Sequence, residues 1–210
     1  MKKVGFSTRT IAYTAVMTAM VAVATMVLKI QTADSYTNLG DAVIFLTAAF
    51  FGPIPALIAG GVGSFLADLL TYPTTMWFTL VIKGIEGLIA GSVVYLADKT
   101  FSRESKKSTI IKLAIYILGM IIAAIWMVGG YYLAKAFSYG TKESALISLP
   151  KNCIQGGISL IVAIVLYGLL YPVAKKMEFK SIKGHSLNNE SDTIDKHEDD
   201  SNNLNDLRKD

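Results

Sequence analysis

The chain has 210 residues, of which 52% are hydrophobic and only 17% are charged, and its formal net charge is +4. This composition is typical of an integral membrane protein and argues against a soluble globular one. With one cysteine, Cys153, the chain cannot form an internal disulfide.

The first apolar run, residues 11–28, follows the basic residues Lys2, Lys3 and Arg9. It is long for the hydrophobic part of a signal peptide and has about the length of a membrane span. We therefore expect an uncleaved first helix over about residues 9–30.

Apolar runs predict an all-α integral membrane protein with six transmembrane helices. The second and third helices are separated by Pro53 and Pro55, which a continuous helix tolerates poorly. The second is short for a full crossing, which predicts a tilted, kinked or partly re-entrant segment. After the first helix, the expected spans are about 41–52, 54–71, 76–97, 110–134 and 146–172.

The distribution of lysine and arginine predicts the orientation. Eleven of these residues lie at the two ends of the membrane region or between the fourth and fifth spans, and four lie on the opposite side. Both termini are therefore expected in the cytoplasm, in agreement with an even number of spans.

The fourth span, MWFTLVIKGIEGLIAG from residue 76 to 91, carries two charges in its middle, Lys83 and Glu86. A charge at the centre of a membrane helix costs roughly 2.5–3.5 kcal/mol on insertion scales. Residues three apart share one face of a helix, so these two can pair. The pair could simply lock helix packing, or it could face a cavity filled with water or ligand.

Polar and aromatic residues of several spans share one depth, in the outer half of the predicted bundle. Such convergence favours a binding pocket over scattered packing contacts. We expect aromatic rings to stack on a small ring compound, polar groups to fix it, and the 31–40 loop to close over it. The predicted substrate-binding residues are Tyr36, Asn38, Trp77, Lys83, Glu86, Trp126, Tyr132, Asn152 and Gln155. Asp41 is placed in the first external loop or at its edge.

Small residues recur at a spacing of four on two helices. Ala15 and Ala19 form an Ala-x-x-x-Ala pair on the first span, a face that can pack inside the protein or receive a partner helix. On the third span, the stripe Ala56, Gly60, Ser64 and Asp68 favours contact within the chain.

The chain lacks the sequence motifs of several functional classes. The chain has no phosphate-binding Gly-x-x-x-x-Gly-Lys-[Ser/Thr] loop and no visible internal repeat. Its two histidines, His185 and His197, lie near the C-terminus, away from any serine or cysteine of the spans. We therefore expect no enzymatic activity, no catalytic residue, no metal site and no cofactor.

Two regions are predicted. Residues 1–183 form the membrane domain, and residues 184–210 form an acidic cytoplasmic tail with eight acidic and three basic residues. The tail has too few apolar residues to fold alone, which predicts disorder.

Five stretches together resemble one family. They are LGDAVIFL from residue 39, FGP from 51, GSFLADLL from 63, FTLVIKGIEG from 78, and Leu149-Pro150 followed by Asn152 and Gln155. Over about residues 8–173 the chain is similar to the substrate-binding S components of energy-coupling factor (ECF) transporters, which are ABC transporters. The details are most similar to the branch associated with thiamine-precursor or vitamin B6-like compounds.

This resemblance implies a multi-pass protein of the bacterial plasma membrane that captures a water-soluble vitamin or precursor from outside. It also implies a transmembrane coupling subunit and two ATPase subunits as partners, with Ala15 and Ala19 matching the docking face for the coupling subunit. No nucleic acid partner is expected. The alternative is a stand-alone proton-coupled secondary transporter that uses Glu86 or Asp68 as proton carrier.

Overall fold

The computed structural model describes residues 8–32, 35–101, 106–139 and 142–176. They form six α-helices and one two-stranded antiparallel hairpin, in which Lys29 pairs with Asn38 and Thr32 with Ser35. The elements are α1 (Thr8–Val27), β1 (Lys29–Thr32), β2 (Ser35–Asn38), α2 (Gly40–Phe51), α3 (Pro53–Thr71), α4 (Met76–Thr100), α5 (Lys106–Tyr139) and α6 (Lys142–Lys176). The predicted tail 184–210 lies outside the described residues.

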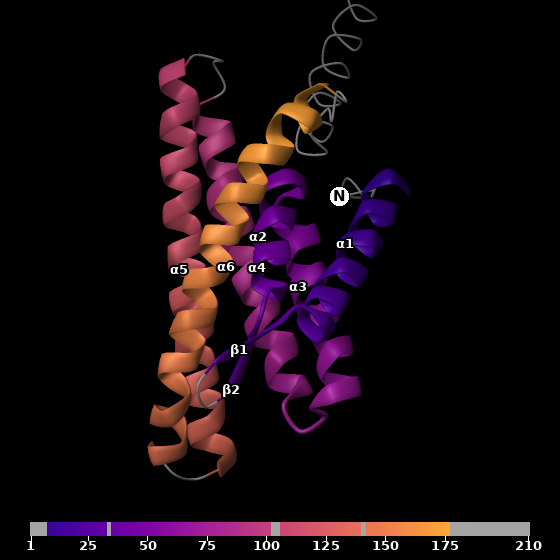
Figure 1. Ribbon diagram of the computed structural model, residues 1–210. Coiled ribbons are helices and arrows are strands. Elements are labelled where there is room, and N and C mark those ends of the chain that lie inside the picture. Colours follow the sequence, from indigo (N-terminus) through magenta and orange to yellow (C-terminus); the bar gives the residue numbers. More distant parts are fainter. Residues whose placement is uncertain (1–7, 33–34, 102–105, 140–141, 177–210) are drawn as a thin grey trace, which may run out of the picture.

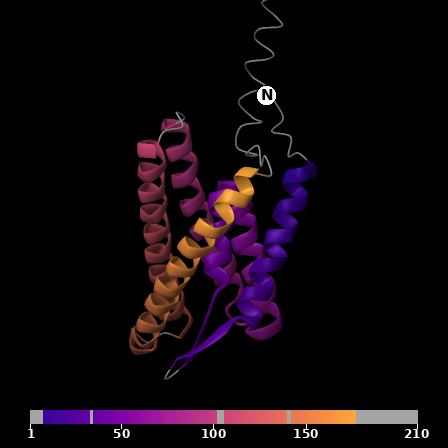
Figure 2. The same ribbon diagram turned by 45° about the horizontal axis from the view of Figure 1, so that its top comes forward.

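The helices run up and down beside one another as a bundle (Figure 1). The start of α1, the start of α5 and the end of α6 lie at one end of the bundle. The hairpin and the turn between α3 and α4 lie toward the opposite end, and the same arrangement is visible in the tilted view of Figure 2. The structure thus has two distinct ends, one of which carries the hairpin.

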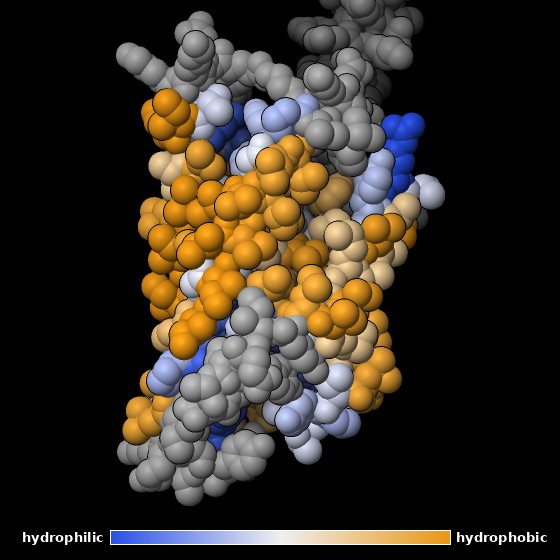
Figure 3. Space-filling model, viewed as in Figure 1, coloured by the Kyte–Doolittle hydropathy of each residue, from blue (hydrophilic) through white to orange (hydrophobic). Residues whose placement is uncertain are grey.

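Five of the helices are long and apolar enough to cross a membrane: α1, α3, α4, and the segments 109–137 of α5 and 148–172 of α6. The sixth, α2, has 12 residues and is shorter than a full crossing requires. An apolar band covers the middle of the face shown in Figure 3, between more polar ends. The six helices confirm the expected helical segments, whereas the hairpin stands where the sequence predicts the end of the first span and the 31–40 loop.

The short helix α2 forms the centre of the bundle. It packs against α1, α3, α4 and α6, and its residues from Gly40 to Ala49 are all buried. A helix that is apolar on all sides is expected in such a position. The helix ends at Phe51 and is followed by Gly52, whose φ of 85° suits glycine. Pro53 then begins α3 at a position that proline favours.

Glycines allow α3 and α4 to lie against each other. A Cβ atom added to Gly60 would lie 2.5 Å from the carbonyl oxygen of Lys83, so a larger residue would push the two helices apart. Ala56, one turn earlier, is fully buried and approaches Gly87 of α4. The small-residue stripe on α3 therefore makes contact within the chain, as its spacing favours.

Candidate functional site

A buried ion cluster joins α2 and α4. The Nζ atom of Lys83 donates a hydrogen bond to Oδ1 of Asp41 and lies 2.9 Å from Oε2 of Glu86. Lys83 is 4% exposed, and both carboxylates are completely buried. The structure therefore contains the pair that the spacing of Lys83 and Glu86 predicts, together with a second carboxylate.

Asp41 follows directly on the first loop, at the edge where the sequence places it, and its carboxylate is completely buried. It lies in the first turn of α2, inside the bundle. Its second oxygen, Oδ2, accepts a hydrogen bond of 3.0 Å from Nε2 of Gln155, and Oε1 of that glutamine accepts one of 3.2 Å from the hydroxyl of Thr37. These contacts form a continuous polar path from the hairpin through α6 and α2 to α4.

The cluster holds two carboxylates and one ammonium group in the interior. Burying charge is costly unless it is paired, and the ammonium of Lys83 pairs with both carboxylates. The contact between Lys83 and Glu86 lacks the alignment of a hydrogen bond, and neither oxygen of Glu86 accepts a hydrogen bond from a described residue. Glu86 is therefore held mainly by charge.

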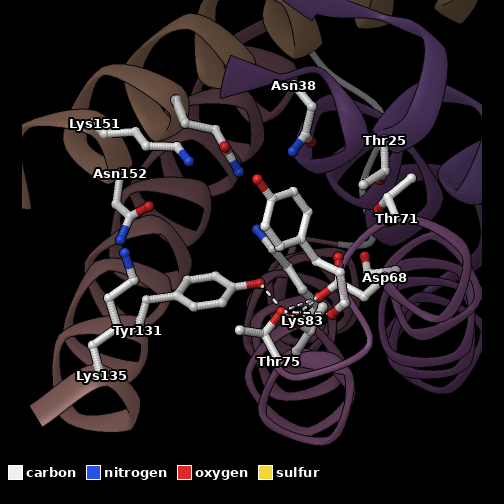
Figure 4. Close-up of a pocket in the computed structure, with 14 residues that line it drawn as sticks. Thr25, Asn38, Asp68, Thr71, Thr75, Lys83, Tyr131, Lys135, Lys151 and Asn152 are labelled. Atoms are coloured by element: carbon white, nitrogen blue, oxygen red, sulfur yellow. Dashed lines mark hydrogen bonds between the residues drawn. The ribbon is translucent and has the colours of Figure 1, made fainter. Parts of the chain in front are cut away.

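A polar cavity of about 300 Å³ lies next to this cluster (Figure 4). It is bounded by α1, the end of the hairpin, α3, α4, α5 and α6. The residues that line it are Thr25, Asn38, Ser64, Asp68, Thr71, Tyr72, Thr75, Thr79, Lys83, Tyr131, Lys135, Lys151, Asn152 and Gln155. Hydroxyl, amide and charged groups are frequent among them, although the outer surfaces of the same helices are apolar.

Asp68 organises one wall of the cavity. Its Oδ2 atom accepts a hydrogen bond of 2.5 Å from the hydroxyl of Thr79, and the hydroxyl of Thr75 lies 3.1 Å away. The hydroxyl of Tyr131 donates to that of Thr79 across 3.1 Å. The Nζ atom of Lys83 lies 5.7 Å from the centroid of the Tyr131 ring, within the range of a cation–π contact.

Four of the nine predicted binding residues line the cavity: Asn38, Lys83, Asn152 and Gln155. Glu86 lies beside it as the buried partner of Lys83. They come from the hairpin, α4 and α6 and gather at the same end of the bundle. The structure thus brings together the polar part of the predicted set.

The aromatic part of the set is placed differently, since Trp77, Trp126 and Tyr132 are not among the residues that line the cavity. Trp77 is 62% exposed, and the centroid of its ring lies 5.2 Å from the centroid of the Phe65 ring. The indole Nε1 of Trp126 donates a hydrogen bond of 3.1 Å to the backbone carbonyl of Ile82. Tyr36 belongs to β2, but its side chain lies outside the described residues.

Other cavity residues are absent from the predicted set, above all Tyr131, Lys135 and Lys151, and the aromatic Tyr72. A signal for several of them exists in the sequence. Tyr131 and Lys135 are four apart, as are Lys151 and Gln155, and residues four apart share one face of a helix. Polar pairs at this spacing inside apolar runs mark the faces that line the cavity.

Ala15 and Ala19 lie elsewhere, on the outside of α1, and both are exposed. Val21 and Ala24, on another face of the same helix, are buried in the core with Val43 and Ile44 of α2. The Ala-x-x-x-Ala pair is thus not used for packing among the described residues.

The family model for "ECF-type riboflavin transporter, S component" matches residues 5–172. An "Uncharacterized protein in gap 3'region" of Pyrococcus woesei is 40% identical over 159 residues, which cover 75% of this chain and 96% of that protein. A UPF0397 protein of Staphylococcus aureus (strain MSSA476) is 28% identical over 195 residues, or 90% of this chain and 100% of that protein. None of these descriptions names a thiamine-precursor or vitamin B6 branch. The chain therefore belongs to the family of ECF-type riboflavin transporter S components, which are multi-pass proteins of the cell membrane and subunits of transporters, not enzymes.

Proposed function

We propose that this protein is the substrate-capture subunit of an ECF-type vitamin uptake transporter. It binds a small water-soluble vitamin or precursor from outside the cell and hands it to an ATP-driven coupling module. The observation that carries the proposal is the polar cavity of about 300 Å³ within a bundle of apolar helices. Concave sites with a few converging polar groups are the usual form of a small-molecule site.

The size of the cavity favours a compact substrate. Its volume is at the lower end of about 300–1,000 Å³, the usual range for ligand pockets. This favours a single-ring compound, similar to pyridoxine or a thiamine precursor, over the larger three-ring riboflavin of the family description. The amides of Asn38, Asn152 and Gln155 would fix the polar edges of the ring, while Lys83 would lie beneath it.

We propose that all six helices lie in the membrane, with α2 entering only part of its thickness and both termini in the cytoplasm. The distribution of basic residues in the sequence supports this orientation. The cavity end of the bundle, with the hairpin, then faces outward. A substrate could enter from the external solution without crossing the apolar middle of the bundle.

The hairpin can connect substrate binding to the rest of the protein. Thr37 in β2 donates to Gln155, and Gln155 donates to Asp41, so a movement of β2 would disturb contacts of both α6 and α2. Asn38, the next residue of β2, lines the cavity. Closure of the hairpin over a bound substrate would therefore exclude water and alter the surface that a partner meets.

The partner in this proposal is the transmembrane coupling subunit, which works with two ATPase subunits. Ala15 and Ala19 are exposed on α1, where small side chains allow another helix to approach closely. In lipid, close packing is a main attraction between helices. The exposed alanine face therefore supports the docking role that the family resemblance implies.

The experiment that tests the capture role is native mass spectrometry of the full chain, purified in a mild detergent. The expected result is one co-purified small molecule per protein, released when the protein is unfolded. A protein that carries no small molecule, and gains none after incubation with a mixture of vitamins, would contradict the proposal.

One observation favours the second candidate, a proton-coupled secondary transporter. Glu86 is completely buried, and its oxygens accept no hydrogen bond from the described residues, so its carboxylate could take up a proton. Against this candidate, Glu86 lies 2.9 Å from Lys83, which stabilises the charged carboxylate. Proton-driven transport by the isolated chain in liposomes would separate the two candidates.

A further inference from the structure

The charges around the cavity balance one another. The charged residues that line it are three lysines and one aspartate: Lys83, Lys135, Lys151 and Asp68. Lys83 also contacts the two buried carboxylates of Asp41 and Glu86. In their usual ionised forms, these described residues supply three positive and three negative charges. The site therefore has no net charge with which to attract an ion.

The charges are also spread over opposite sides of the cavity. Asp68 of α3 lies across from Lys135 of α5 and Lys151 of α6 (Figure 4). Lys151 interacts electrostatically with Asp68 and has a further interaction of its own. A ligand with a net charge would be attracted to one side and repelled by the other. It would also lose hydration between apolar helices without gaining a compensating charge.

Most of the cavity wall is polar but uncharged. Ten of the fourteen side chains that line it have a hydroxyl or an amide as their only polar group. Both groups can donate as well as accept hydrogen bonds. Such a wall suits a ligand that carries hydroxyl, amino or ring-nitrogen groups and no ionised one.

Asn152 of α6 is the best placed of these uncharged groups to bind a ligand. Its side chain lines the cavity and is only 7% exposed. It forms no hydrogen bond with any other described residue. A buried amide without partners is costly, and nearly all such groups in proteins are hydrogen-bonded. A ligand with a donor and an acceptor side by side would satisfy both ends of this amide.

We propose that the substrate binds without net charge and presents a hydrogen-bond donor and an acceptor to the amide of Asn152. This inference rests on the proposed function, since it specifies the compound that the cavity captures. It predicts the free, uncharged form of a hydroxylated or amino-substituted ring compound. It disfavours the phosphorylated, carboxylated and ammonium-bearing forms of the same ring.

The test offers the purified full chain three equimolar sets of probes, each with one ring system in a neutral, a cationic and an anionic form. The first set is pyridoxine, pyridoxamine and 4-pyridoxate. The second is the hydroxymethylpyrimidine part of thiamine, its aminomethyl analogue and its phosphate. The third is riboflavin, 5′-amino-5′-deoxyriboflavin and riboflavin 5′-phosphate.

Native mass spectrometry at neutral pH measures how much of each probe is captured. In the set that the chain recognises, we expect the neutral probe to be captured at least tenfold more than either charged one. A charged probe captured within tenfold of its neutral relative, or more strongly than it, would overturn the inference.

Two nearly isosteric changes alter the charge balance in opposite directions. Asp68→Asn leaves one excess positive charge and should raise capture of the anionic probe, relative to the neutral one, at least tenfold. Asn152→Asp adds one negative charge and should raise relative capture of the cationic probe to a similar extent. Lys135→Gln removes a positive charge on a different helix and should act in the same direction as Asn152→Asp.

The matched control is Asp98→Asn, the same chemical change near the opposite end of α4, where Asp98 pairs with Lys112. It should keep the wild-type ratios within twofold. If the changes at the cavity also leave the ratios within twofold, or all shift them in the same direction, the charge balance does not select the substrate and the inference is overturned.

The outcomes separate this inference from the proposed function. A chain that captures a charged probe, or carries a charged compound from the cell, keeps its role in capture but contradicts the uncharged site. If the wild-type chain captures no probe and carries no compound from the cell, the capture role itself fails, and the inference fails with it.

Discussion

Gln155 of α6 donates a hydrogen bond of 3.0 Å from Nε2 to Oδ2 of Asp41 in α2, although 114 positions separate the two residues in the sequence. The same carboxylate accepts a hydrogen bond from Lys83 of α4 through its other oxygen. One buried aspartate thus joins three helices directly beside the cavity. The network has consequences for stability as well as for binding.

Replacing Lys83 with methionine should strongly destabilise the protein. The change removes the ammonium group and leaves Asp41 and Glu86 as two buried like charges. Removing one partner of a buried ion pair costs about 3–5 kcal/mol. Asp41→Asn should cost less, because the remaining pair of Lys83 and Glu86 is neutral. Unfolding of the purified variants in detergent measures both losses of stability. A Lys83→Met variant as stable as Asp41→Asn would show that Lys83 does not stabilise the two buried carboxylates.

Asn152→Ala should weaken binding of the captured compound about tenfold or more, since a buried polar group left without its partner costs ~1–3 kcal/mol. Asn152 lines the cavity, whereas its neighbour Cys153 is exposed on the outside of α6. Cys153→Ala is therefore the matched control and should bind normally. Isothermal titration with the compound identified by mass spectrometry gives both affinities, and equal affinities would exclude Asn152 from the site.

Glu86→Gln should also weaken binding by about tenfold or more, because Glu86 holds Lys83, and Lys83 lines the cavity. Folding in detergent should survive, since Lys83 keeps Asp41 as a partner. The same titration measures the effect. A Glu86→Gln variant with the wild-type affinity would mean that the ion cluster serves packing alone.

Much of the fold could be predicted from the sequence because each helix depends on a local signal. Apolar runs give the helices, and Gly52 with Pro53 marks the break between α2 and α3. The pair of Lys83 and Glu86 could also be predicted, because a spacing of three is enough to bring two side chains of a helix together. The contact of Lys83 with Asp41 could not, since it spans 42 positions and depends on how α2 packs against α4.

The cavity was harder to predict because depth in the bundle does not determine which way a side chain points. Each step along an α-helix turns the side chain by about 100°. Tyr131 therefore lines the cavity while its neighbour Tyr132 does not. Trp77 and Trp126 share the predicted depth, but one is largely exposed and the other bonds to the backbone of α4. Rotation about the helix axis follows from packing, which the sequence alone does not specify.

Replacing both Ala15 and Ala19 with leucine should stop co-purification of the coupling subunit and stop uptake in cells. Leucine side chains on this exposed face would keep a partner helix at a distance. Substrate affinity should stay nearly unchanged, because neither residue lines the cavity. Ala114→Leu, at another exposed alanine on α5, serves as the control and should keep the partner. A double variant that keeps its partner but loses the substrate would refute the docking role.

Thr74, in the exposed turn between α3 and α4, should be accessible from outside the cell, and Thr100, at the end of α4, should not. The prediction follows from the positive-inside rule applied to the basic residues at the α4 end. Single cysteines at the two positions, introduced after Cys153→Ala, can be labelled with a membrane-impermeant maleimide on intact cells. Labelling of position 100 with protection of position 74 would invert the proposed topology.

The most direct test of the capture role uses liposomes that contain the purified chain either alone or with the coupling subunit and its two ATPases. We expect the chain alone to bind the substrate without accumulating it, with or without a proton gradient, and we expect accumulation to require the complete module and ATP. Accumulation by the chain alone, driven by a proton gradient and abolished by Glu86→Gln or Asp68→Asn, would be incompatible with a pure capture subunit and identify a proton-coupled transporter instead.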